Sequence, residues 1–285
     1  MRRKTLSRYG LKWNPFSPEI PTEACRVTPK IENFCWRVEN LAREGGFALV
    51  TGEVGCGKSV ALRILAHRLA GLRDAVVGVL TRPQGSVQDF YRELGALFGV
   101  ALSPHNRWAG AKVLRERWET HIETEKMRAI LIVDEAQEMH AAVLGELRLL
   151  CSADLDSRSL LTVVLGGDGR LPERFRSPEL VALGSRIRVR LGLEHAPVEE
   201  LAEYLGHVLG EAGNPRLMTR QLKETLCEHA AGNLRVLMTM AGELFDAAVQ
   251  RDADQLDEKL YLEVFAPPAS PRSAGKKRNS RRRAR

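Results

Sequence analysis

The stretch GEVGCGKS at residues 52–59 places glycines, a lysine and a serine at the spacing G-x-x-x-x-G-K-S. Glycine lets the backbone turn tightly, so that successive N–H groups can point inward at phosphate oxygens. In this pattern Lys58 contacts the β- and γ-phosphates, and the Ser59 hydroxyl binds Mg²⁺. The stretch therefore predicts a site for a nucleoside triphosphate. The residues expected to bind it are Gly52, Glu53, Val54, Gly55, Cys56, Gly57, Lys58, Ser59 and Val60.

A glycine-rich turn before a helix is the simpler explanation of this stretch, and its surroundings decide between the two. Residues 47–51 form an apolar run typical of a buried strand, and residues 59–71 carry apolar side chains at helical spacing. Strand, loop and helix in this order are the context that phosphate binding requires. We therefore favour a phosphate loop.

A second motif is the apolar run that ends in Asp134 and Glu135, within AILIVDEAQ at residues 129–137. The carboxyl end of a buried parallel strand lies where such sheets bind their ligands, beside the phosphate loop. We expect Asp134 to hold Mg²⁺, directly or through water, and Glu135 to orient and polarise the attacking water. The alternative is a strand followed by an acidic helix cap, because aspartate caps helices well.

Three further positions could complete such a site. Phosphoryl transfer needs positive charge on the γ-phosphate, often from an arginine of another subunit. Arg186 lies just before the fifth predicted strand, with Arg188 as the second choice; a solvated surface is the alternative for both. Arg235 opens a helix of the C-terminal region and either reaches the nucleotide or lies on the surface. Asp168 follows the fourth predicted strand and either lies near the γ-phosphate or belongs to a simple turn.

The apolar pattern predicts an α/β fold, with a parallel sheet flanked by helices and followed by a small all-helical lid. The last predicted strand alternates apolar and polar residues, which is typical of a sheet edge. The predicted strands are 47–51, 75–80, 129–133, 160–165 and 187–191. The predicted helices are 31–44, 59–71, 86–99, 109–126, 197–212, 219–231, 233–250 and 255–264.

Four segments follow from this pattern. Residues 1–45 are a basic N-terminal arm and a leading helix, and the four prolines within 13–30 predict an extended path there. Residues 46–192 are the nucleotide-binding core, residues 193–265 the helical lid, and residues 266–285 a disordered basic tail.

Positive charge is concentrated at the two ends of the chain. The sequence holds 43 Lys and Arg against 36 Asp and Glu, a net charge of +7. Residues 1–12 carry five basic side chains and residues 272–285 carry eight, and neither segment has an acidic one, so the body between them is mildly acidic. Two basic arms on such a body favour nucleic acid as a partner, although a basic end can also serve solubility alone.

Signals of other protein classes are missing from the sequence. The five cysteines are scattered without a C-x-x-C pair, so neither zinc nor a disulfide framework is indicated. No apolar run approaches the ~18 residues of a transmembrane helix. The basic start is not followed by the apolar segment of a secretory signal. We therefore expect a cytoplasmic protein with no membrane partner.

With these residues in place, the chain resembles an AAA+ ATPase. More narrowly, it is similar to the ExeA-like branch, which includes the transposition ATPases TniB, TnsC and MuB. Five stretches match the motifs of that branch in order: YGLKWNPFSPEIP, GFALVTGEVGCGKS, LIVDEAQEM, SRI before the fifth strand, and AAGNLRVL. One stretch departs from it. The branch usually has Gly-Gln-Pro-Glu-Leu after the fourth strand, where this chain has GDGRL at 167–171, so Asp168 replaces the sensor glutamine.

The resemblance implies a P-loop AAA+ fold and a Mg²⁺-dependent ATPase whose nucleotide is ATP. It further implies a homo-oligomer, a ring or helical filament on duplex DNA, that recruits a DDE-type transposase and falls apart on hydrolysis. Its catalytic residues would be Lys58, Glu135, Asp168 and Arg186, with Arg235 on the nucleotide and Ser59 and Asp134 on the metal.

Two other classes remain open. One is a secretion or cell-envelope ATPase, as some ExeA-like proteins are, for which we expect a transmembrane segment and an outer domain. The other is a replication initiator or loader, for which we expect a winged-helix or helix-turn-helix domain after the lid.

The basic tail gives a first prediction. Each phosphate neutralised on duplex DNA adds about 0.9 to the slope of log affinity against log salt, so the eight basic groups of 272–285 set an upper bound of roughly 7. Deleting 272–285 should weaken DNA binding at low salt and flatten the salt dependence, while basal ATPase activity stays nearly unchanged. Titrations of duplex DNA at three salt concentrations measure this. An unaltered slope combined with lost transposase binding would place the tail on the transposase instead.

Overall fold

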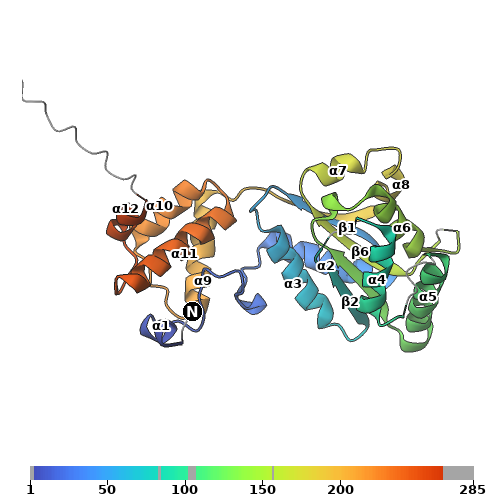
Figure 1. Cartoon of the computed structure of the whole chain (residues 1–285), viewed down its shortest axis with the longest axis horizontal. Coiled ribbons are helices and arrows are strands. Elements are labelled where there is room, and N and C mark those ends of the chain that lie inside the picture. The colour runs from blue at the N-terminus through green and yellow to red at the C-terminus, as the bar shows by residue number, and fades with distance from the viewer. Residues whose placement is uncertain (1–2, 83–84, 102–106, 156, 266–285) are drawn as a thin grey trace, which may run out of the picture.

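The computed structural model describes residues 3–82, 85–101, 107–155 and 157–265. Figure 1 shows two parts: a core built around a β-sheet on the right, and a group of helices on the left. The N-terminal segment begins beside the helical part and continues into the core. The tail at 266–285, which we predict to be disordered, lies outside the described residues.

The core holds a five-stranded sheet in which neighbouring strands run parallel, in the order β2-β3-β6-β1-β7. Its strands are β1 (Gly46–Gly52), β2 (Ala75–Leu80), β3 (Arg128–Val133), β6 (Leu161–Gly167) and β7 (Ile187–Leu193). The predicted parallel sheet is confirmed, with each predicted strand end within two residues of its observed place. β7 lies at an edge, and its side chains alternate between buried and exposed, as the sequence predicts.

Helices cover both faces of the sheet. Successive side chains of a strand point to opposite faces. On β1, Phe47 and Leu49 belong to an apolar cluster shared with α4, α5 and α6, while Ala48 and Val50 belong to another shared with α2 and α3. This burial on both faces explains why the strands are continuous apolar runs. These helices are α2 (Pro29–Glu44), α3 (Lys58–Ala70), α4 (Val87–Phe98), α5 (Arg107–Thr120) and α6 (Ala141–Cys151).

Several elements between β3 and β7 are not predicted from the sequence. They are α6, the short helices α7 (Arg170–Arg174) and α8 (Val181–Gly184), and the hairpin of β4 (Ser152–Ala153) and β5 (Arg158–Ser159). α6 has a signal that could have been read, because Val143, Leu144, Leu147 and Leu150 have helical spacing and are buried. The others are too short to show a period. The helix expected at 109–126 is α5 followed by a π-helical turn, His121–Glu125.

The left-hand part is the predicted all-helical lid. Its helices are α9 (Val198–Ala212), α10 (Arg220–Ala230), α11 (Leu234–Gln250) and α12 (Glu258–Phe265). Leu205, Leu226 and Phe245 are fully buried among them. Within the residues that the structure describes, no helix has both the length and the apolar character needed to cross a membrane.

The N-terminal arm is fastened to the lid. It begins with an unpredicted short helix, α1 (Arg3–Arg8), and its otherwise extended path contains one 3₁₀ turn at Thr22–Ala24. Tyr9 and Phe16 each pack edge-on against Phe245 of α11, with ring centroids 5.1 and 5.7 Å apart. The arm therefore supplies part of the lid's apolar core.

Two of the arm's cations are held within the protein. Arg8 forms ion pairs with Asp252 and Asp254, and the Lys12 Nζ donates a hydrogen bond to the Glu211 carbonyl at 3.2 Å. The sequence leaves open whether the basic front of the chain binds nucleic acid. These contacts favour a structural role for Arg8 and Lys12.

Candidate nucleotide-binding site

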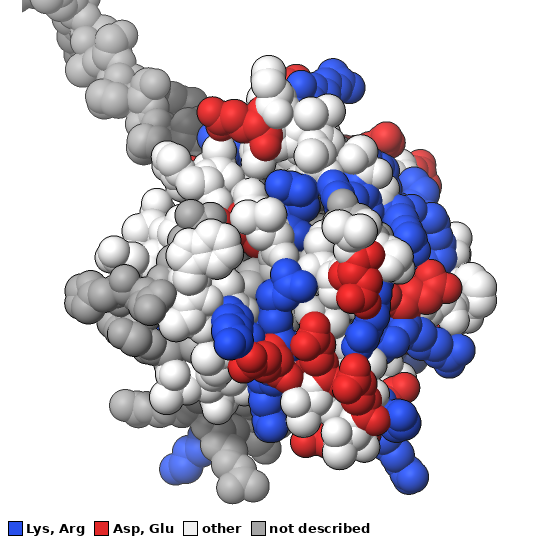
Figure 2. All heavy atoms as spheres, turned by 90° about the vertical axis from the view of Figure 1, so that its right-hand side faces the viewer, with Lys and Arg blue, Asp and Glu red and all other residues white. Residues whose placement is uncertain are grey.

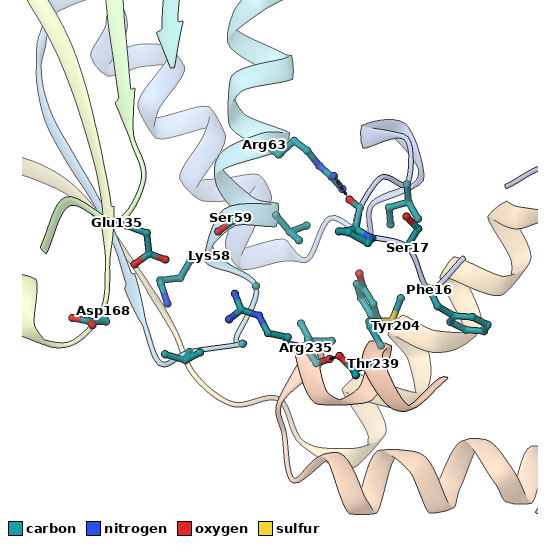
Figure 3. A pocket seen from close by; sticks show the side chains of 18 residues that line it. Phe16, Ser17, Lys58, Ser59, Arg63, Glu135, Asp168, Tyr204, Arg235 and Thr239 are labelled. Carbon is teal, nitrogen blue, oxygen red and sulfur yellow. Dashed lines mark hydrogen bonds between the residues drawn. The ribbon is translucent and has the colours of Figure 1, made fainter. Parts of the chain in front are cut away.

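Three neighbouring strands bring the predicted residues to one edge of the sheet. β1 continues into the phosphate loop, β3 into Asp134 and Glu135, and β6 into Asp168. Because the strands are parallel, their carboxyl ends meet. A cavity of about 630 Å³ opens there between the core, the lid and the N-terminal arm (Figure 3). Its lining from the core includes Val54, Gly55, Gly57, Lys58, Ser59, Val60, Glu135 and Asp168.

The phosphate loop has the shape that anion binding requires. Gly55 and Gly57 have φ angles of +84° and +96°, in the left-handed region that favours glycine. The helix α3 begins at Lys58, directly after them, so its N-terminal N–H groups lie at the cavity. Lys58 is 7% exposed, and its Nζ donates to the carbonyls of Gly52 and Glu53, both at 2.9 Å. The loop thus holds the ammonium group where phosphates would bind.

Four predicted residues lie next to the cavity without lining it. Gly52 and Glu53 contribute the carbonyls that hold Lys58. Cys56 is buried, and burial raises the pKa of its thiol. Asp134 lies behind Glu135, and its Oδ1 accepts a hydrogen bond from the Glu135 N–H at 2.9 Å.

Glu135 leaves β3 in a rare conformation and faces the cavity. Its φ is +53°, and non-glycine residues in this region occur preferentially at functional sites. One carboxylate oxygen accepts a hydrogen bond from the Gln137 Nε2. Asp134, behind it, offers carboxylate oxygens, and Ser59, in the cavity lining, offers a hydroxyl; these are the oxygen ligands that Mg²⁺ prefers. The residues present therefore fit the predicted metal.

The lid touches the phosphate loop through Asn233, a residue that the sequence analysis missed. Its Nδ2 donates to the Val54 carbonyl at 3.0 Å, and its Oδ1 accepts from the Val236 N–H at 3.1 Å as the N-cap of α11. A Cβ added to Gly55 would lie only 2.0 Å from this Oδ1. Asparagine before an apolar helix is a capping signal that could have drawn attention to it.

The remaining wall of the cavity is largely apolar and comes from the arm and the lid. Its apolar residues are Phe16, Pro18, Ile20, Leu234 and Met238, beside Tyr204. Arg63 of α3 donates from Nη1 to the Pro18 carbonyl at 2.9 Å, which ties the arm to the helix of the phosphate loop. Such a wall suits the flat, apolar faces of a nucleotide base. Arg235 extends into the same cavity from the start of α11 (Figure 3).

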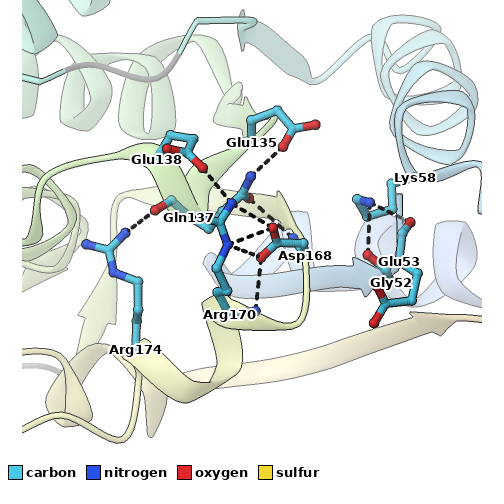
Figure 4. A network of polar contacts seen from close by, with 9 residues as sticks. All are labelled: Gly52, Glu53, Lys58, Glu135, Gln137, Glu138, Asp168, Arg170 and Arg174. Atoms are coloured by element: carbon cyan, nitrogen blue, oxygen red, sulfur yellow. Dashed lines mark hydrogen bonds and ion pairs between the residues drawn. The ribbon is translucent and has the colours of Figure 1, made fainter. Parts of the chain in front are cut away.

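Asp168 lines the cavity, and its side chain also closes a turn. It therefore combines the place in the cavity and the turn that the sequence offered as alternatives. Its Oδ1 accepts a hydrogen bond from the Arg170 N–H at 2.9 Å. Its carboxylate also pairs with the Arg170 guanidinium, which in turn pairs with Glu138 (Figure 4).

Arg186 and Arg188 lie at the edge of the sheet where the strands begin, opposite the edge where the phosphate loop lies. The first residue of β7, Ile187, pairs with the beginning of β1, so these arginines sit at the amino ends of the strands, away from the phosphate loop of their own chain. Together with Arg128 and Arg158 they line a second cavity of about 550 Å³. The predicted arginine and the nucleotide site are therefore on opposite edges of one sheet.

Comparisons with known sequences agree with this architecture. Residues 41–175 match a family described as "AAA domain". General secretion pathway protein A of Aeromonas hydrophila is 30% identical over 216 residues, which are 74% of this chain and 39% of that protein. The chain thus spans well under half the length of this relative.

Solved structures are similar over most of the chain. The ORC2 protein of Aeropyrum pernix, in ADPNP and ADP complexes, has a TM-score of 0.71 at 16% identity, covering 88% of this chain and 70% of that one. Drosophila ORC bound to DNA has a TM-score of 0.62 at 17% identity, covering 93% and 65%. Identities this low show the fold alone, and that fold is the predicted AAA+ P-loop fold.

The matched AAA domain and the AAA+ fold support a nucleotide-hydrolysing ATPase. Membership of the ExeA-like branch stays a prediction, favoured by the similarity to general secretion pathway protein A. The narrower resemblance to transposition ATPases stays a prediction, as do the roles of the individual site residues.

The contact between Asn233 and the phosphate loop predicts that Gly55 is sensitive to substitution, although the pattern G-x-x-x-x-G-K-S allows any residue there. Gly55→Ala should abolish nucleotide binding, because the new Cβ collides with Asn233 and the φ of +84° is strained for alanine. Titration with a fluorescent nucleotide measures this. Gly145→Ala in α6, where an added Cβ meets nothing within 4 Å, is the control and should bind normally. Normal binding by Gly55→Ala would show that the lid does not rest on the loop.

Proposed function

We propose that this chain is a Mg²⁺-dependent ATPase that uses ATP to assemble head to tail on duplex DNA, recruits a DDE-type transposase to that DNA, and disassembles on hydrolysis. One observation carries the assembly: the candidate nucleotide cavity and the arginine cluster lie at opposite edges of the same sheet. An active site completed by an arginine from a second copy requires this arrangement.

The residues of the chain supply the parts of ATP hydrolysis. The loop N–H groups and Lys58 bind the phosphates. Ser59 and Asp134 would hold Mg²⁺, which when bound neutralises charge on the phosphate oxygens. The Glu135 carboxylate accepts a proton from the attacking water. Arg235, reaching in from the lid, makes lid position depend on the nucleotide.

Assembly follows from the placement of Arg186. At the far edge of its own sheet, its charge can act on a γ-phosphate only in a neighbouring subunit. Contact between two different surfaces of identical subunits produces rings or helical filaments. ATP turnover would then require the assembled form, since an arginine supplied in trans contributes about 10³–10⁵ in rate.

Duplex DNA as the partner is supported by two features and limited by a third. The tail at 272–285 is strongly basic, and one of the structures with this fold, Drosophila ORC, is a complex with DNA. The end of the core farthest from the lid, however, carries basic and acidic side chains side by side (Figure 2). In this region α5 and its following turn hold the pairs Lys112–Glu116 and Arg117–Glu125. We therefore do not assign DNA binding to that end.

The relative from Aeromonas hydrophila favours a second candidate function, an ATPase of a secretion pathway, because the match includes 74% of this chain. Both candidates hydrolyse ATP. They differ in whether duplex DNA promotes assembly and turnover.

DNA dependence is the decisive test. ATPase activity should rise with protein concentration and with added duplex DNA. Glu135→Gln should bind ATP without turnover, because an amide does not accept a proton from water as a carboxylate does, and electron microscopy should show it as ordered oligomers on DNA. Turnover that is indifferent to DNA, by a protein that stays monomeric in light scattering, would exclude the DNA proposal and favour the secretion candidate.

A mixing experiment tests the arginine in trans. Arg186→Ala should lower turnover by about 10³-fold, and Lys58→Ala should be inactive. An equal mixture should recover part of the activity, because an intact Lys58 in one subunit meets an intact Arg186 in the other. Arg190→Ala, on the exposed side of β7, is the control and should remain active. Without recovery in mixed oligomers, Arg186 is not the arginine in trans, and Arg188 is next to be tested.

A further inference from the structure

A carboxylate stands where the phosphate site would be expected to carry a neutral or positive group. Asp168 lines the nucleotide cavity together with Lys58 and Glu135. Its side chain is only 18% exposed, so water screens its charge incompletely. A γ-phosphate that binds Lys58 would approach Asp168, and like charges at short range repel. An acid in this place therefore needs a counter-ion.

Arg170 is that counter-ion. Its backbone N and its Nε each donate to the Asp168 carboxylate at 2.9 Å, and its Nη2 lies 2.8 Å from Oδ2. The same Nη2 lies 2.6 Å from the Glu138 Oε1, so the guanidinium is shared between two carboxylates at the rim of the cavity (Figure 4). These bonds, with a smaller contribution from Lys58, hold the pKa of Asp168 below its usual value. Asp168 is therefore ionised at neutral pH, and the positive charge of Arg170 compensates its negative charge.

The same loop is connected to Glu135 through Gln137. The Gln137 Oε1 accepts from the Asp168 N–H at 3.3 Å, and its Nε2 donates to the Glu135 carboxylate. Gln137 is 8% exposed, and a Cβ on Gly167 would lie 2.6 Å from its Oε1, so glycine is needed for this approach. Gln137 thus connects the backbone of Asp168 to the residue that we expect to activate water.

We infer that Arg170 determines the preference of this site for a nucleoside triphosphate over a diphosphate. By neutralising Asp168, it allows a γ-phosphate to bind beside that carboxylate. A diphosphate has no γ-phosphate to meet Asp168, so its binding is independent of the pair. The inference rests on the proposed binding of ATP, and it assigns a role to a residue that does not itself line the cavity.

A double-mutant cycle that removes the two charges singly and together tests the inference. Affinities for ADP and for a non-hydrolysable ATP analogue are measured by calorimetry for the wild type, Arg170→Ala, Asp168→Asn and the double variant. Like-charge contacts in binding sites lower affinity more than about tenfold. Arg170→Ala should therefore weaken the analogue by about tenfold or more relative to ADP. Adding Asp168→Asn should restore the ratio to within about threefold of the wild type, because the unpaired charge is gone.

Two controls separate this role from a structural one. Arg176→Ala removes an exposed arginine from the same region and should leave both affinities unchanged. Arg170→Lys keeps the charge and should largely keep the ratio. The affinity for ADP reports in every variant whether the site is folded.

Each remaining outcome counts against the inference. An unchanged ratio in Arg170→Ala, or a double variant as impaired as the single one, would show that Arg170 does not set the preference. Loss of ADP and analogue binding together in Arg170→Ala and Arg170→Lys would make its role structural. A wild-type protein that binds neither nucleotide would overturn the proposed ATPase itself, and this is seen before any variant is made.

Discussion

Parallel pairing of β3, β6 and β1 is the constraint on which the rest of the molecule depends. The register sets Val133 beside Leu165 and Thr51 beside Gly167, so the phosphate loop, the Asp134–Glu135 pair and Asp168 all leave the sheet at one edge. Backbone hydrogen bonds and burial on both faces hold this register, and no interaction among the site residues is needed for it. The parallel pairing of β7 with β1 places Arg186, directly before β7, at the opposite edge, where the strands begin. Placement of the site and the proposed need for a second subunit thus have one origin.

The cavity is closed by segments that are remote in sequence and joined through backbone groups. Asn233 of the lid contacts the Val54 carbonyl, and Arg63 of α3 contacts the Pro18 carbonyl of the arm. The arm is also part of the lid's apolar core through Tyr9 and Phe16. The lid and the arm thus supply two walls of the cavity, and both contact the segment that holds the phosphate loop. In the proposed ATPase these contacts link nucleotide occupancy to lid position, before any charge on Arg235 is considered.

Local signals made the fold and the phosphate loop predictable. Glycine spacing is read within eight residues, and apolar runs mark strands whose two faces are buried. Contacts between distant segments were not predictable: Asn233 reads as a helix cap, and only the fold shows that it rests on Gly55. Charge counting at the front of the chain is incomplete for a similar reason. Composition records Arg8 as a cation, but it does not record that Asp252 and Asp254 neutralise it.

The loop after β6 shows why two unusual residues occur together there. The branch that this chain resembles has glutamine and glutamate at the positions of Asp168 and Arg170. Glutamine to aspartate alone would add a negative charge at a site for phosphates, and glutamate to arginine alone would leave a cation without this partner. Together they form an ion pair and leave the loop one unit less negative than the glutamine–glutamate pattern. The backbone N–H of residue 168, which glutamine and aspartate both supply, is the group through which Gln137 connects the loop to Glu135. Arg170 is thus the residue that makes an acid at position 168 compatible with a phosphate site.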